Sequence, residues 1–537
     1  MVEMSEKVSR IWEEALRAIQ DSDAIQSAPD DHQVVIRSVA SVATRIQALQ
    51  AIADYAGKYG GASSWIRSAE RLFLSEAIDA IANESCLEGL APEARNEIEA
   101  LKSAAEYQNT HVRISEYEAI GVDLLASNAR NDRSIPTESD DGSAERELRS
   151  STRKFAQDVV APLAEDIHRK DLLIPETIIS QLAEMGYFGL SIPEAYDGVG
   201  MNYLMMVLAT EELSAASLGA AGSLMTRPEI LSKALLKGGT ETQKLHWLPK
   251  IASGEGMVAV AVTEPNTGSD VAAVSCRATR TEGGFLLNGS KAWCTFAGRA
   301  NVLALLARTD DSPGAGNKGL SLFIVDKDVF EGHDFVMKQR GGGVLTAKAD
   351  ATLGYRGMHS FTLQFDDYFV PASNLVGEED GEGKGFYLQM DGFAVGRLQT
   401  GGRAVGLVQA ALETTVAYAN GRPQFGKPIA EYQNTRYEIG KMAVELEAAR
   451  QLTYTAARAM DRGDSNASTL AAMAKLFSCR MAVTNTQRGQ LMHGGWGYAE
   501  EYPISRYVVD ALVLPIFEGV EPILEMKVIG RAILSGR

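Results

Sequence analysis

The sequence predicts a mainly helical protein with a β domain in the middle of the chain. Residues 1 to about 128 and 146 to about 254 carry apolar side chains at three- and four-residue intervals, the period of amphipathic helices. Short apolar runs bounded by turn residues follow, and they indicate strands up to about residue 376. Helical spacing returns from Gly385 to the end. A chain of 537 residues is also too long for one ordinary domain.

Four segments are expected: an N-terminal helical extension with a linker, a helical domain, a β domain and a C-terminal helical bundle. Their expected bounds are 1–145, 146–256, 257–380 and 381–537, and the polar stretch from 128 to 145 is the expected linker. Asn288-Gly289 is a strong hairpin signal within the β region, because both residues tolerate positive φ. No strand–helix–strand alternation appears, and no GxGxxG follows a strand, so a Rossmann dinucleotide fold is not favoured.

The charge balance and the lack of targeting signals restrict the class of protein. Lys and Arg number 52 against 70 Asp and Glu, a formal net charge of −18, which argues against nucleic acid or an anionic membrane as the main partner. The first residues, MVEMSEKVSRIWEEAL, have neither the apolar core of a signal peptide nor the Arg-rich character of a transit peptide. No apolar stretch is long enough to cross a bilayer. We therefore expect a cytoplasmic protein with no membrane insertion.

The cysteines and histidines give no metal-binding pattern. Cys86, Cys276, Cys294 and Cys479 lie far apart without a CxxC pair, which suits a reducing compartment. The seven histidines show no HExxH and no spacing that would collect a metal. We expect no metal site.

Two stretches of the β region suggest a ligand site. VAVTEPNTGSDVAA (Val260 to Ala273) leaves a strand and enters a turn rich in hydroxyls and backbone N–H groups, which suits an anionic group or a flavin edge. The alternative is a simple turn between two strands. In KAWCTFAG, strand alternation places Trp293 and Thr295 on one side, where a ring could cover a flat ligand and a hydroxyl could bond to it. The alternative is a core Trp beside a surface Thr.

A carboxylate near the C-terminus is the candidate base. Glu518 stands in PIFEGVEPI after the apolar run ALVLPIF, where it looks set for burial. A carboxylate removed from water holds a proton more readily, as a base working near neutral pH requires. The alternative is a solvent-facing Glu at a helix N-terminus.

Taken in order, these stretches resemble the acyl-CoA dehydrogenase family. The shared motifs span roughly residues 146 to 535 and are TEPNTGSD, LNGSKAWCT, FVPASNLVG, GRPQFGKPIAEYQNTRYEIGKMA, HGGWGYAEEYPISRYVVDA and FEGVEPI. The resemblance implies a helical domain, a β-barrel-like domain and a four-helix bundle that bind FAD non-covalently. It also implies an acyl-CoA substrate, an electron-transfer flavoprotein as acceptor, and a homo-oligomer that is at least a dimer.

The resemblance also assigns residues to roles. Glu518 matches the base that removes the α-proton while a hydride leaves the β-carbon for flavin N5, and its own backbone N–H, with a flavin ribityl hydroxyl, polarises the thioester carbonyl. Val520 and Pro522 depart from polar residues usual in the family, which removes two side-chain contacts to FAD. The implied cofactor-binding residues are Val262, Thr263, Ser269, Trp293, Thr295, Arg422, Phe425, Gly494 and Gly495, with Arg422 and Phe425 reaching the FAD of a neighbouring chain. Ser269 and Gly519 are also implied to contact substrate.

Arginines in the expected acyl pocket indicate the substrate class. Arg227 interrupts the apolar helix GSLMTRPEILSKALL, where it could hold a substrate carboxylate in a bidentate fork, and Arg403 is a second candidate. The alternative for Arg227 is a pair with Glu229 or a solvent-facing position. Arg397 lies where relatives contact the CoA portion. A cation in the pocket favours a dicarboxylic acyl group. The resemblance, together with the N-terminal extension, implies a short branched one, methylsuccinyl-CoA, converted to mesaconyl-CoA as in the ethylmalonyl-CoA pathway.

Other classes stay open on the sequence. A short- or branched-chain monocarboxylic acyl-CoA dehydrogenase would lack the clamp, and an acyl-CoA oxidase would share Glu518 but admit oxygen. A flavin monooxygenase of the same fold normally lacks the Glu. A non-catalytic scaffold would not require Trp293, Thr295 and Glu518 together.

Overall fold

The described part of the chain forms two compact units. A computed structural model describes residues 2–22, 25, 27, 29–60, 64–84, 91–102, 110–129 and 143–535. The bundle unit comprises 1–151, 207–211 and 400–537, and the sheet unit comprises 152–206 and 212–399. Most of the expected linker, residues 130–142, lies outside the described residues, as does Cys86.

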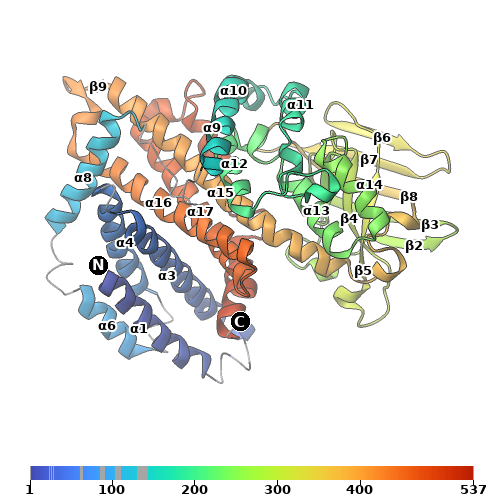
Figure 1. The fold of residues 1–537 in the computed structure, drawn as a ribbon, viewed down its shortest axis with the longest axis horizontal. Coiled ribbons are helices and arrows are strands. Elements are labelled where there is room, and N and C mark those ends of the chain that lie inside the picture. The colour runs from blue at the N-terminus through green and yellow to red at the C-terminus, as the bar shows by residue number, and fades with distance from the viewer. Residues whose placement is uncertain are drawn as a thin grey trace. The chain divides into compact units, whose positions relative to one another are not determined.

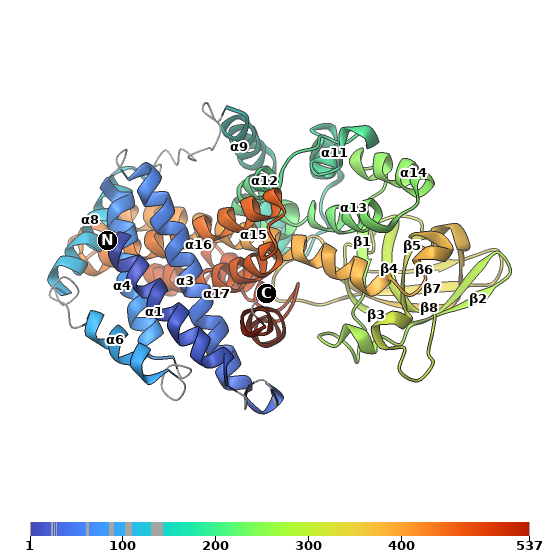
Figure 2. The same cartoon turned by 60° about the horizontal axis from the view of Figure 1, so that its bottom comes forward.

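In the residues of the bundle unit that the structure describes, the regular structure is helical apart from one small hairpin. Its N-terminal helices α3, α4 and α8 pack on α16, and α3 also packs on α17, as the blue and orange ribbons of Figures 1 and 2 show. The helices of this unit are α1 (Val2–Gln20), α3 (Gln33–Tyr59), α4 (Ser64–Ala82), α6 (Pro92–Lys102), α8 (Thr110–Ala126), α16 (Gln433–Arg462), α17 (Ala467–His493), α18 (Ile504–Ala511), α19 (Glu521–Ile523) and α20 (Arg531–Leu534). Three more helices, α9 (Ser143–Phe155), α12 (Tyr203–Ala216) and α15 (Gly385–Gly421), contribute residues to both units.

The N-terminal extension is an integral part of the bundle. Two glycines allow α8 and α16 to touch backbone to backbone: a Cβ on Gly121 would lie 2.0 Å from the Arg436 carbonyl oxygen, and one on Gly440 would lie 1.9 Å from that of Tyr117. On α4, the ring of Phe73 meets that of Phe477 on α17 edge to face at 5.7 Å. Residues expected only to be helical therefore form a layer over the C-terminal helices.

A polar group is buried in this layer. The Tyr117 hydroxyl donates a hydrogen bond of 2.5 Å to Glu76 Oε1, and Lys441 Nζ lies 4.0 Å from the same oxygen. Burial, with the nearby Glu445 charge adding to it, raises the pKa of Glu76 to about 7. The carboxyl group therefore resists ionisation in the folded protein.

The sheet unit carries a curled sheet of eight strands. The strand order is β1-β4-β2-β3-β8-β7-β6, with β5 pairing β4, and pairing is antiparallel except for β1–β4 and β2–β4. The strands are β1 (Val258–Ala261), β2 (Arg277–Thr281), β3 (Gly284–Thr295), β4 (Val302–Arg308), β5 (Leu320–Asp326), β6 (Asp334–Lys338), β7 (Val344–Asp350) and β8 (Ser360–Pro371). The predicted fold class, mainly helical with a central β domain, is confirmed.

Helices cover one end of this sheet. Leu231 of α13 and Leu248 of α14 pack in one apolar cluster with Val258 of β1 and Ile324 of β5, and the green ribbons of Figure 1 show α13 and α14 beside these strands. The helices wholly within this unit are α10 (Ala161–Arg169), α11 (Glu176–Glu184), α13 (Thr226–Gly238) and α14 (Glu241–Ala252). None of the described helices is long and apolar enough to span a membrane.

The hairpin predicted at Asn288-Gly289 is wrong. These residues lie inside β3, and the chain reverses instead at Glu282-Gly283, between β2 and β3. The ladder between β3 and β8 shifts register at this point, and Gly289 takes a φ of 132°. The Asn288 side chain exchanges two hydrogen bonds of 2.9 Å with Asp367, one to its carboxylate and one from its backbone N–H. Between the pairs Leu287–Tyr368 and Gly289–Phe365, β8 has two residues against the single Asn288 of β3, so the β-bulge lies on β8.

The described cysteines form no disulfide. Cys276, Cys294 and Cys479 are all buried and free. Burial raises the pKa of Cys276 and Cys479 to about 11, so both remain protonated thiols near neutral pH.

The buried carboxyl of Glu76 predicts a pH-dependent stability. Its folded pKa of about 7 exceeds its ordinary value of 4.5, so its favourable contribution is complete below pH 4.5 and is lost as the pH rises to about 7. Glu76→Gln keeps an acceptor for Tyr117 but cannot ionise. Its melting temperature relative to the unmodified protein should therefore rise between pH 5 and pH 8. Glu97→Gln, at an exposed site on α6, is the control and should show no such trend.

Candidate functional site

In the sheet unit, a buried ion pair fixes the turn after β1 to strand β3. Lys291 is fully buried, and its Nζ donates to Glu264 Oε1 at 2.9 Å and to the Val262 carbonyl oxygen at 3.0 Å. The Ala292 N–H donates to the Thr263 carbonyl oxygen at 2.8 Å. The loop and the strand that the sequence singled out separately are therefore joined at successive residues.

Glu264 is stabilised as a carboxylate. Its oxygens accept hydrogen bonds from the Ser275 N–H and hydroxyl and from the Cys276 N–H, at 2.7 to 2.9 Å. Burial opposes ionisation, but the Lys291 charge and these hydrogen bonds outweigh it and hold the pKa of Glu264 below its usual range. The loop therefore has a fixed anchor, while Ser269 lies exposed at its far end.

A bulge in β3 presents Trp293. The register with β8 shifts between Lys291 and Cys294, and Trp293 has a φ of 58°. Trp293 is 59% exposed, whereas Thr295 is 8% exposed, with its hydroxyl 2.9 Å from that of Ser360. The alternative of a core Trp beside a surface Thr is wrong, and the uninterrupted alternation assumed for this strand is also wrong. The bulge turns a large ring out of the sheet.

Arg227 is buried on α13. Its side chain is 5% exposed, and its Nη1 donates to the Tyr355 hydroxyl at 3.0 Å and to the Ser223 carbonyl oxygen at 3.2 Å. Glu229 instead accepts a hydrogen bond from Ser191. Neither alternative for Arg227, a pair with Glu229 or a solvent-facing side chain, is found. Among the described residues of the sheet unit, no carboxylate lies within ion-pair distance of this guanidinium.

In the bundle unit, Glu518 is held in a strained loop. Its φ is 54°, that of Gly519 is 102°, and the Glu518 side chain is half-buried rather than solvent-facing. Left-handed backbone at a residue with a side chain is unusual and persists only where neighbours enforce it. The Glu521 N–H closes the loop by donating to the Pro515 carbonyl oxygen at 2.9 Å.

Two buried cations brace this loop on either side of Glu518. The Lys475 Nζ, 1% exposed, donates to the Gly519 carbonyl oxygen at 2.7 Å. The Arg403 guanidinium, also buried, lies 4.7 Å from the centre of the Phe517 ring. Of the predicted residues, Glu518, Gly519 and Arg403 therefore come together.

The other predicted residues of this unit lie at two exposed places. Phe425 and Gly426, with φ values of 50° and 88°, form the two-residue turn of the hairpin β9 (Pro423–Gln424) and β10 (Lys427–Pro428), and Phe425 is 95% exposed. Arg422 precedes this hairpin. Gly494 and Gly495 follow α17, and no atom lies within 4 Å of a Cβ built on either. Arg397 is half-buried on the part of α15 that belongs to the sheet unit.

Several residues of the site were missed by sequence reasoning. Lys291 and Glu264 stand inside motifs that were noticed, and a lysine in the middle of an apolar strand is a signal for a buried partner. Tyr355 and Lys475 left no such signal, because their partners are far away in the sequence.

Removal of the Lys291 charge tests whether the ion pair of Lys291 with Glu264 stabilises the fold. Lys291→Met should lower the free energy of unfolding by about 3–5 kcal/mol at pH 7, because it leaves the Glu264 carboxylate buried without its cation. The deficit should shrink as the pH falls below 4.5, because a carboxylate with a lowered pKa contributes stability that is lost on protonation. Denaturant unfolding at a series of pH values measures the loss of unfolding free energy and its change with pH. The control is Lys338→Met, which replaces an exposed lysine of β6.

Comparisons with known proteins agree with this architecture. Models of the acyl-CoA dehydrogenase N-terminal, middle and C-terminal domains match residues 142–255, 259–368 and 383–534. The chain is 43% identical to (2S)-methylsuccinyl-CoA dehydrogenase of Cereibacter sphaeroides, over 72% of this chain and 69% of that protein. It is 35% identical to isovaleryl-CoA dehydrogenase of Solanum tuberosum, over 73% of this chain and 90% of that protein.

Solved structures give the same result. Butyryl-CoA dehydrogenase from Megasphaera elsdenii superposes with a TM-score of 0.67 at 31% identity, over 73% of this chain and 98% of that one. The glutaryl-CoA complex of glutaryl-CoA dehydrogenase superposes with a TM-score of 0.67 at 32% identity, over 74% of this chain and 96% of that one. The chain therefore belongs to the acyl-CoA dehydrogenase family, whose cofactor is FAD.

Proposed function

We propose that the protein dehydrogenates a short branched dicarboxylic acyl-CoA between its α- and β-carbons, with methylsuccinyl-CoA as substrate and mesaconyl-CoA as product. The observation that carries the substrate class is Arg227, a buried cation whose polar contacts are a phenol and a carbonyl. The similarity to a protein named for methylsuccinyl-CoA supports the same choice.

A buried guanidinium without a carboxylate favours an anionic ligand. Removal of a charge from water is costly, and neutral acceptors offset only part of that cost. The planar fork of arginine binds a carboxylate with two parallel hydrogen bonds, and the Tyr355 hydroxyl and Ser223 carbonyl hold the guanidinium in place. We assign Arg227 to the distal carboxylate of the substrate. Arg403 lies against Phe517, so its proposed role is to position the Glu518 loop.

Glu518 is the proposed base. In the proposed reaction its carboxylate removes the α-proton, and its backbone N–H donates to the thioester oxygen as negative charge develops there. The braces from Lys475 and Arg403 fix the direction of this side chain before substrate binds. Ser269 and Gly519 are proposed to contact the acyl-CoA, and Arg397 its CoA portion.

Each unit, taken by itself, offers groups that suit FAD. When bound, FAD supplies the acceptor for the hydride that leaves the β-carbon. Trp293 offers an exposed flat ring, Thr295 a hydroxyl, and the loop from Val262 through Thr263 to Ser269 a row of donors. Gly494 and Gly495 leave open space that side chains would fill.

The hairpin tip supports an oligomer. A phenylalanine that is 95% exposed on a tight turn contributes nothing to its own core. We propose that Phe425, with Arg422, reaches the FAD of a second copy, so that the working protein is at least a dimer. An electron-transfer flavoprotein is the proposed acceptor. We further propose that the chain divides functionally at 1–145, 146–256, 257–380 and 381–537.

The base is tested with Glu518→Gln, which keeps the size of the side chain. Anaerobic reduction of the bound flavin by methylsuccinyl-CoA, followed as loss of its absorbance, should slow by about 10²- to 10⁴-fold. Glu501→Gln, at an exposed site in the same unit, should leave the rate unchanged. An unimpaired Glu518→Gln variant would contradict the assignment.

The proposed binding of the distal substrate carboxylate by Arg227 is tested with Arg227→Met, which keeps an unbranched side chain but removes its charge. The value of kcat/KM for methylsuccinyl-CoA should fall about 100-fold, the effect of losing one partner of a buried charge pair. The value for butyryl-CoA, which has no distal carboxylate, should not fall. Equal losses for both substrates, or no loss for either, would discard Arg227 as the clamp.

A further inference from the structure

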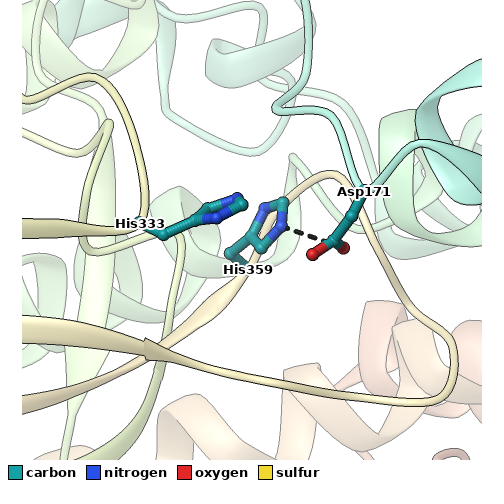
Figure 3. Close-up of side chains that lie close together, drawn as sticks. All are labelled: Asp171, His333 and His359. Carbon is teal, nitrogen blue, oxygen red and sulfur yellow. Dashed lines mark hydrogen bonds and ion pairs between the residues drawn. The ribbon is translucent and has the colours of Figure 1, made fainter.

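Three metal-ligand side chains meet in the sheet unit, on segments far apart in the sequence. Figure 3 shows Asp171, which follows α10, His333, which precedes β6, and His359, which precedes β8. Each offers a ligand atom within 4.8 Å of the other two. His359 Nε2 lies 3.2 Å from Asp171 Oδ1, and the two imidazole rings lie 4.5 Å apart, centre to centre.

The surroundings of His359 leave one of its ring nitrogens without a suitable partner when the ring is neutral. Its Nδ1 lies 3.2 Å from the Gly357 carbonyl oxygen, and its Nε2 faces the Asp171 carboxylate, so both ring nitrogens point at acceptors. A neutral imidazole carries one N–H, so either tautomer leaves a lone pair facing an oxygen. A second proton would satisfy both acceptors, but the His359 side chain is only 5% exposed, and a charge buried in this way is costly.

We propose that Asp171, His333 and His359 form a binding site for a divalent transition-metal ion of the Zn²⁺ type. A proton on Nδ1, donated to the Gly357 carbonyl, leaves the Nε2 lone pair for the metal; such a backbone partner commonly orients metal-bound histidine. Two imidazoles and one carboxylate are a ligand set that zinc takes, with water in the fourth position. Asp171 is 44% exposed, which leaves room for that water.

The three side chains can reach the geometry of such an ion if His333 turns toward the other two. With zinc bonds of about 2.0–2.2 Å, two tetrahedral ligand atoms lie roughly 3.4 Å apart. The His359–Asp171 separation already meets this value, and His333 is exposed and can turn toward it. Asp171 and His359 have φ values of 52° and 48°, and strained backbone of this kind gathers at ligand-binding positions.

One neighbouring cation competes for the carboxylate. Arg356 Nε lies 3.4 Å from Asp171 Oδ1. Its guanidinium also donates to the carbonyl oxygens of Thr352, at 3.2 Å, and His168, at 3.0 Å. Arg356 is therefore shared between Asp171 and two carbonyl groups, and it weakens the attraction of the carboxylate for a metal. A bound ion would tie the turn after α10 to the residues that precede β6 and β8, next to the Ser360–Thr295 hydrogen bond.

The test is calorimetric titration of ZnCl₂ into the FAD-loaded, chelator-treated full chain without an affinity tag. One ion should bind per chain and raise the melting temperature. His333→Ala and Asp171→Asn should each weaken binding by about tenfold or more and abolish the thermal shift. His246→Ala, an exposed histidine elsewhere in the sheet unit, should bind as the unmodified protein does.

Two outcomes would overturn the site: no stoichiometric binding by the unmodified protein, or binding that both variants retain. Flavin absorbance and the melting temperature without zinc establish that each variant is folded. His333 is exposed, so its replacement tests the site even if Asp171→Asn fails to fold.

Discussion

The buried pair of Lys291 and Glu264 is the constraint on which the candidate residues of the sheet unit depend. It ties the turn after β1 to β3, and the next residues along β3 form the bulge that presents Trp293. A buried ion pair is rarely a net source of stability, because desolvation offsets the attraction. Its value here is geometric: the Lys291 ammonium joins the Glu264 carboxylate and the Val262 carbonyl, so a loop rich in donors keeps one position relative to the exposed ring.

In the bundle unit, buried cations also fix the position of a candidate residue, but with different chemistry. Glu518 sits in backbone that its side chain disfavours, and two buried cations contact the residues on either side of it. Lys475 holds a carbonyl and Arg403 holds an aromatic ring. Preorganisation of this kind fixes the direction of a side chain in advance, which is what the proposed role of Glu518 as a base requires.

Periodicity and motif order were enough to predict the helix–strand–helix arrangement, and the family resemblance supplied the candidate residues. Local signals failed where long-range pairing decided the outcome. Asn288-Gly289 is typical of a turn in isolation, but pairing with β2 and β8 makes it part of a strand, opposite a bulge of β8. Strand alternation could not anticipate the second bulge, which exposes Trp293 and leaves Thr295 buried.

Contacts between distant residues carried no sequence signal. Asp171 and His359 are 188 positions apart, so no spacing rule could have grouped them with His333. The docking of the N-terminal extension on α16 depends on Gly121 and Gly440, two glycines whose role appears only when their helices meet.

The central claim is that this family member selects a distal carboxylate. The most direct measurement compares anaerobic flavin reduction in the unmodified protein by methylsuccinyl-CoA, glutaryl-CoA, isobutyryl-CoA and butyryl-CoA. The account predicts that methylsuccinyl-CoA is fastest and that both monocarboxylic substrates are slower by about 100-fold, the difference that one buried charge pair provides. Equal or faster reduction by butyryl-CoA or isobutyryl-CoA would contradict it and leave a dehydrogenase of ordinary short-chain specificity.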